Sequence, residues 1–133
     1  MIGAIRRHSI ERLFVILVAV HSFSIGIMLL FFTGWTLDFA GWQGVDSYFF
    51  PRQGGVFHLI VAVGYFLEHR RHDGVTLMVM AKSAAVVFLL VMNSWDVAWS
   101  LTFSGILDGL MLAGILVLRR LSAAERRPRR LSA

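Results

Sequence analysis

The sequence contains no cysteine among its 133 residues. This absence excludes disulfide bridges, cysteine-ligated zinc, iron–sulfur clusters and thiol catalysis. Lysine is almost absent as well. Lys82 is the only lysine, and apart from the histidines all other basic residues are arginines. The chain also lacks a nucleophile motif or a cofactor motif, so we expect a protein that is not an enzyme.

Apolar residues, by contrast, are abundant. They make up 57% of the chain, and the mean hydropathy is +0.71. A soluble domain of this length cannot bury so much apolar surface, whereas a bilayer does not require it to be buried. The net charge of +5 comes from arginines in short clusters beside apolar stretches. This pattern favours anchoring to an anionic lipid surface over binding to nucleic acid.

Four apolar runs predict four membrane-spanning helices, since about 20 residues at ~1.5 Å each cross a ~30 Å core. The first run is longer than the apolar core of a signal peptide and no small-residue cleavage site follows it, so we expect it to stay in the protein. The last segment predicts a largely disordered basic tether. The predicted divisions are a basic arm at 1–12, spans at about 13–32, 52–68, 75–93 and 97–118, an outer loop at 33–51 and a basic tail at 119–133.

The charges predict the orientation. Arginines cluster in the arm, in the second loop and in the tail. The first connection has only Arg52, against Asp38 and Asp46, and the third loop has only Asp96. Under the positive-inside rule, this places both termini in the cytoplasm. The four tryptophans fall on the opposite side as an interfacial belt. The sequence therefore predicts an all-α membrane protein, a four-transmembrane-helix bundle with N-in/C-in topology.

The spacing of aromatic residues in the outer loop indicates helix. Trp35, Phe39 and Trp42 recur at helical intervals. We expect this part of the loop to rest on the outer leaflet, and the alternative is a lid over a cavity in the bundle.

Two opposite charges fall inside the predicted spans, where charges are costly. Lys82 lies thirteen residues before Trp95 and Asp108 lies thirteen residues after it. In an antiparallel hairpin the two side chains share one depth, which predicts an ion pair. The pair is either a lock between two helices or a proton or ligand site, and snorkelling of Lys82 toward the cytoplasm would break it.

Two further polar residues, Glu68 and His58, are candidates for this site, and His21 is considered with His58 as a possible haem ligand. Glu68 either extends the network toward Lys82 or lies at the interface beside Arg71. His58 is expected to hydrogen-bond Gln53 or the outer loop. His21 is expected roughly 10 Å deeper than His58, so paired haem ligation is not expected. No two-histidine metal spacing occurs within a span, and we predict no metal site.

Small residues at four-residue intervals indicate close helix packing. Intramolecular packing is the expected use of these positions, and a second copy or another membrane protein is the alternative partner. The longest such stripe consists of Gly105, Gly109 and Ala113.

The segment 50–59 (FPRQGGVFHL), followed by Gly64-Tyr65, Glu68, Ala81-Lys82 and Asp108, resembles small bacterial four-helix membrane proteins of the DoxX-like and BphX-like kind. The resemblance implies a bundle in the bacterial cytoplasmic (inner) membrane, in a family often encoded beside oxidoreductases. Some relatives are linked to quinone-dependent redox enzymes. An autonomous redox role is not expected for this chain, because it lacks cysteine and paired haem ligands.

Together these features predict an accessory or scaffold subunit of a larger membrane complex, respiratory or redox in character. The alternative is a small carrier, or a quinone- or lipid-binding protein, whose cavity is lined by His58, Glu68, Lys82 and Asp108. No cofactor is predicted beyond that quinone or lipid. The expected partners are the lipid bilayer and another membrane protein or a second copy, and not nucleic acid.

Overall fold

The protein is described by a computed structural model that covers residues 2–91 and 98–126. Within these ranges the regular structure is entirely helical, which confirms the predicted all-α fold. The predicted turn around Trp95 lies outside the described residues. The elements are α1 (Ile2–Phe31), α2 (Thr33–Phe39), α3 (Phe49–His72), α4 (Thr76–Val86), the π-helix η1 (Val87–Val91) and α5 (Trp99–Arg126).

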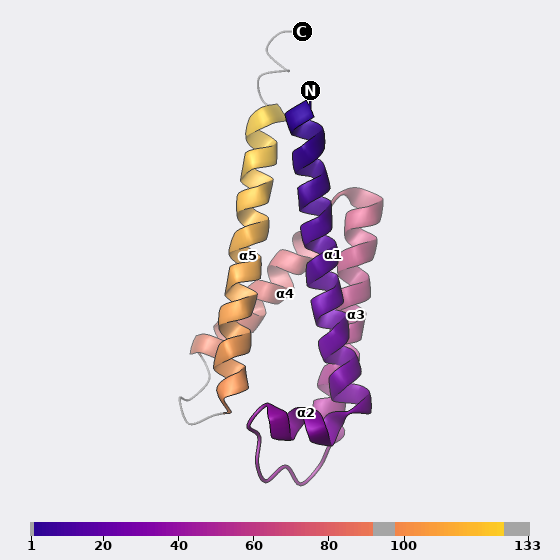
Figure 1. The fold of residues 1–133 in the computed structure, drawn as a ribbon, viewed down its shortest axis with the longest axis vertical. Coiled ribbons are helices and arrows are strands. Elements are labelled where there is room, and N and C mark those ends of the chain that lie inside the picture. The colour runs from indigo at the N-terminus through magenta and orange to yellow at the C-terminus, as the bar shows by residue number, and fades with distance from the viewer. Residues whose placement is uncertain (1, 92–97, 127–133) are drawn as a thin grey trace.

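The helices alternate in direction, as Figure 1 shows. α1 runs away from the N-terminus, α3 returns beside it, α4 and η1 cross obliquely behind, and α5 returns toward the starting end. α1 packs most extensively against α3, and α5 contacts α1, α4 and η1. The start of α1 and the end of α5 therefore lie at one end of the bundle, which we call the terminal end. α2 lies across the opposite end.

Two of these helices are long and apolar enough to cross a membrane: the stretch Ser9–Phe31 of α1 and the stretch Trp99–Ala124 of α5. The stretch Thr76–Val91 is apolar but shorter. α3 is long, but its last turn carries four basic or imidazole side chains. The number of membrane crossings therefore stays a prediction.

Three helices extend beyond the predicted spans. α1 already includes most of the predicted basic arm, α3 begins at Phe49 rather than near residue 52, and α5 continues to Arg126. The predicted disorder of the tail is thus wrong for residues 119–126. The physical reason is that helical hydrogen bonding does not end where the apolar run ends. Arginine is a good helix former, and its long side chain can leave the apolar zone while its backbone stays helical.

The predicted helical segment in the outer loop is present as α2. Its Thr33 and Leu37 are buried against the bundle, whereas Trp35 and Phe39 are exposed and stack on each other with ring centroids 5.5 Å apart. The hydroxyl of Thr36 donates to the Met28 carbonyl oxygen at 3.0 Å, which fastens α2 to the end of α1. Trp42 also is exposed but follows the helix.

One apolar core joins all four long segments. It is formed by Val15 and Val18 of α1, Tyr65 of α3, Met78 of α4 and Ile115 of α5. The core is small, and many large apolar side chains remain on the outer surface of the bundle. A polar residue buried in this interior is costly unless it finds a partner.

Candidate functional site

The predicted ion pair between α4 and α5 is present. Lys82 Nζ and Asp108 Oδ1 form a salt bridge and a hydrogen bond, and both residues are buried. The equal spacing on either side of Trp95 does bring the two side chains to one depth. Snorkelling of Lys82 is not observed, since its ammonium group is held by the carboxylate. Each charge thereby offsets part of the other's desolvation cost.

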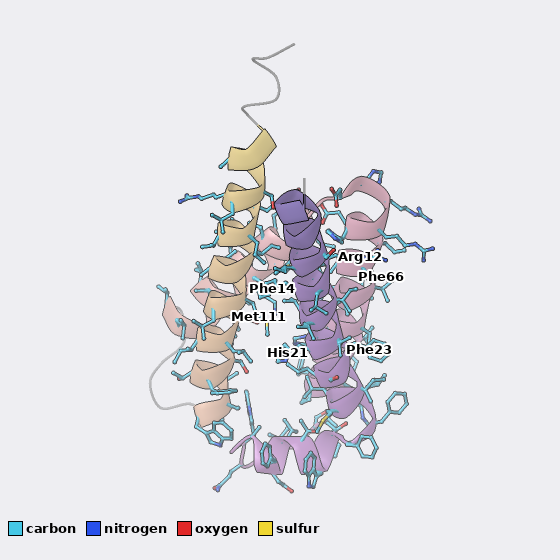
Figure 2. All side chains as sticks on the ribbon, turned by 45° about the horizontal axis from the view of Figure 1, so that its top comes forward. Arg12, Phe14, His21, Phe23, Phe66 and Met111 are labelled. Carbon is cyan, nitrogen blue, oxygen red and sulfur yellow. The ribbon has the colours of Figure 1, made fainter. Side chains whose placement is uncertain are left out.

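Three other polar side chains belong to the electrostatic environment of this pair. His21 of α1, and His58 and Tyr65 of α3, all lie within electrostatic reach of Lys82, Asp108 or both. Figure 2 shows His21 on the side of α1 that faces α5. We call these five residues the polar cluster. All four long segments contribute to it, so it is a feature of the assembled bundle.

The histidines of the cluster correct one prediction. His58 was expected to lie much nearer the outer side than His21, but the two imidazoles are close enough to interact electrostatically. His21 is ten residues before the end of α1 at Phe31, and His58 is nine residues after the start of α3 at Phe49. Their depths therefore match, because α3 begins earlier than the apolar run suggested.

His58 also lacks the hydrogen bond that was expected with Gln53 or the outer loop. Its Nδ1 atom is buried and has no hydrogen-bond partner among the described residues. A buried nitrogen without a partner loses its bond to water and gains nothing in return, at a cost of about 1–3 kcal/mol. Such an atom beside a buried ion pair is a candidate contact for a ligand.

Glu68 bonds to the backbone of α4, and its expected place at the interface beside Arg71 stays a prediction. Its Oε1 accepts from the backbone N–H of Thr76 and its Oε2 accepts from that of Leu77, both at 2.9 Å. These are first-turn donors of α4, which have no partner within the helix. Glu68 thus caps α4 across the α3–α4 turn and is not a member of the polar cluster. Gly74 makes room for it, since a Cβ there would lie 2.7 Å from Glu68 Oε1.

A second buried charge network at the terminal end was not predicted. Glu11 is only 2% exposed, and its Oε1 lies 2.8 Å from Arg119 Nε. This is a charge contact without hydrogen-bond alignment. Ser122 donates to the other carboxylate oxygen at 3.3 Å, and Arg119 donates to the backbone carbonyl of Asp73. The network ties α5 to α1 and to the α3–α4 turn. The signal in the sequence was Glu11 itself, the only acid in the basic arm.

The residues of the predicted small-residue stripe on α5 differ in how closely other helices pack against them. Gly105 is buried, and a Cβ there would lie 2.6 Å from Leu90 Cδ2 of η1. Gly109 has only Val86 near it, at 3.7 Å, and Ala113 is exposed. One end of the stripe therefore packs inside the protein, and the other end is open on its surface.

Metal binding has no support in residues 2–91 and 98–126, where no group of three histidine, aspartate or glutamate side chains is placed to hold an ion. The arrangement offers instead a buried ion pair, two imidazoles and a phenol in an apolar bundle. Comparisons with protein-family models, with curated proteins and with solved structures find no match for this chain.

Proposed function

We propose that this chain is a multi-pass protein of the bacterial inner membrane, crossing four times through α1, α3, α4–η1 and α5 with both termini in the cytoplasm. The support is the surface of the bundle, since large apolar side chains are exposed on every helix and surface of this kind indicates a lipid or protein contact. Every crossing segment contributes to it. Examples are Leu17 and Phe23 on α1, Phe57 and Ile60 on α3, Phe88 and Val91 on η1, and Phe103, Ile106 and Leu110 on α5.

The two ends of the bundle support the same orientation. Arg70, Arg71 and Arg120 lie toward the terminal end, whereas Trp35 and Trp99 lie toward the end that α2 covers. Arginine at one boundary and tryptophan at the other are typical of cytoplasmic and external interfaces. A reporter domain fused after Ala133 is expected to be active in the cytoplasm. Activity on the external side would overturn the orientation.

Within this placement we propose a non-catalytic role as an accessory or scaffold subunit of a larger membrane complex, in line with the DoxX-like and BphX-like resemblance. The observation that carries the proposal is that the buried charges pair with each other between helices. Lys82 pairs with Asp108, and Glu11 pairs with Arg119, so that α5 is fastened to both α4 and α1. Side chains engaged in this way stabilise the bundle, and the open end of the α5 stripe at Ala113 remains for a partner helix.

The experiment is purification of the full chain from its native membrane in a gentle detergent, with quantification of co-purifying proteins. We expect a stoichiometric membrane-protein partner, and loss of that partner in Ala113→Phe. Ala84→Phe is the matched control, because Ala84 is also exposed but lies on α4. Purification without any stoichiometric protein would overturn the accessory role.

A second candidate function is favoured by one observation, the unpartnered Nδ1 of His58 beside the ion pair. In this alternative the polar cluster binds a quinone or a polar lipid group. Extraction of the purified protein with organic solvent would then release a stoichiometric small molecule. His58→Phe, which removes the unpartnered nitrogen and leaves the ion pair, should abolish its retention. An extract without such a molecule counts against the ligand-binding role.

A further inference from the structure

A cavity of about 610 Å³ lies between α1 and the end of α3, away from the polar cluster. Its apolar part is formed by Val15 and Ile16 of α1 and by Phe66 of α3. Figure 2 shows Arg12 and Phe66 next to each other on these two helices. The remaining lining belongs to the last turn of α3 and the turn after it. We call this space the basic cavity.

The charge of the basic cavity is strongly positive. Arg12, Arg70 and Arg71 line it, while Asp73 is the acidic residue in its lining. The guanidinium of Arg70 lies 6.0 Å above the Phe66 ring, a cation–π contact that holds the charge at the edge of the apolar part. The cavity thus combines three positive charges and one carboxylate with an apolar wall.

His69 gives an independent sign of a ligand. It lines the cavity and is 8% exposed, yet its Nδ1 has no hydrogen-bond partner among the described residues. Asp73 Oδ1 lies 4.0 Å from this nitrogen, a distance that makes an ion pair only with a protonated imidazole. A buried imidazole nitrogen in this state is ready to bond an incoming polar group. His72 also lines the cavity and adds a second imidazole.

From these features we propose that the basic cavity binds the phosphate group of an anionic phospholipid. Guanidinium groups match phosphate oxygens in geometry and charge. Leu13 and Leu67, which follow the lining residues Arg12 and Phe66 in the chain, are exposed and offer apolar surface for acyl chains. A zwitterionic lipid fits less well, because its ammonium group would stand among three arginines. The inference rests on the proposed membrane placement, which puts this cavity at the cytoplasmic interface, where anionic headgroups are found.

The test uses the full chain purified in a neutral detergent. Binding of phosphatidylglycerol and of phosphatidylcholine is measured by native mass spectrometry over a lipid titration. We expect preferential retention of phosphatidylglycerol, and a roughly fivefold weaker affinity in each of Arg70→Gln and Arg71→Gln. The matched control is Arg120→Gln, which removes the same charge at the same end of the bundle but outside the cavity, and it should bind as the unmodified chain does.

Four results would overturn the proposal. They are an equal loss of affinity in Arg120→Gln, equal retention of the two lipids, unchanged binding in Arg70→Gln and Arg71→Gln, and full competition by inorganic phosphate alone. Both arginines are exposed, so their replacement leaves the core intact, and circular dichroism verifies that. Extraction of the native membrane with alkaline carbonate tests the membrane placement separately. A chain that stays in the pellet but shows no lipid preference would contradict the cavity proposal alone.

Discussion

The bundle contains two helix pairs that are held together in different ways. α1 and α3 meet at Gly26 and Gly55, where a Cβ on either glycine would lie 2.8 or 2.9 Å from the carbonyl oxygen of the other. Their backbones therefore touch. α4 and α5 instead meet through the Lys82–Asp108 salt bridge, with Gly105 against Leu90 nearer to α2.

The difference shows two solutions to one problem. In the proposed membrane placement there is little hydrophobic driving force between the helices, so association would depend on close packing or on polar contacts. Close packing at the glycines is disturbed when a substitution adds a side chain there. An ion pair requires that neither partner be lost alone, although both can be replaced together. The two pairs should therefore respond to opposite kinds of substitution.

The largest effect is expected in the α4–α5 pair. Lys82→Met leaves Asp108 buried without its partner, and we expect a loss of about 3–5 kcal/mol in the free energy of unfolding. Unfolding in detergent, followed by circular dichroism, measures it.

The double variant Lys82→Met/Asp108→Leu is the control for this effect. It removes both charges and should recover most of the lost stability, because no unpaired charge remains. If the double variant is no more stable than Lys82→Met, the pair does not act as a lock and the comparison fails on this side.

A smaller effect is expected in the α1–α3 pair. Gly55→Ala places a Cβ 2.9 Å from Gly26 O and 3.1 Å from Leu30 N, both backbone atoms that cannot rotate away. We expect a loss of about 1–3 kcal/mol in the same unfolding measurement.

The adjacent Gly54 is a matched control, since nothing lies within 4 Å of a Cβ built there. Gly54→Ala should be neutral or more stable by about 0.5–1 kcal/mol, because alanine favours helix. Equal effects at the two glycines would show that helix propensity, and not backbone contact, governs this pair.

The smallest effect is expected where α3 and α4 are joined. Glu68→Ala removes the cap on the amides of Thr76 and Leu77 and should cost about 1 kcal/mol. Gly74→Ala should cost a similar amount, since its Cβ displaces the same carboxylate. Thermal unfolding of both variants measures this. The cap assignment fails if Glu68→Ala is as stable as the unmodified chain.

How much of the site could be predicted depended on how local its geometry is. Lys82 and Asp108 lie at equal distances in the sequence on either side of Trp95, so counting residues was sufficient. Glu11 and Arg119 are far apart in the sequence, and each lies just outside an apolar run. Predicting their contact requires knowing that α1 and α5 are neighbours and that both helices continue beyond those runs.

The histidines illustrate the same limit. Their relative depth depends on where α3 begins, and hydropathy marks the edge of an apolar stretch, not the first helical residue. Once α3 starts at Phe49, His58 comes level with His21 and joins the polar cluster. The role of Glu68 was missed for a related reason. Its acceptors are satisfied by backbone N–H groups, which every sequence contains and no pattern of side chains reveals.

The sequence by itself determined that the protein is helical. It also determined that a few charges lie within the apolar segments, while the arginine clusters lie beyond the ends of these segments. These properties follow from composition and from periodicity along the chain, which act locally. Only the tertiary structure decided which buried groups meet, namely Glu11 with Arg119, the histidines with the ion pair, and α1 with the end of α3 around the basic cavity. Those contacts depend on helix ends and on the angles between helices, and these are set by packing of the whole bundle.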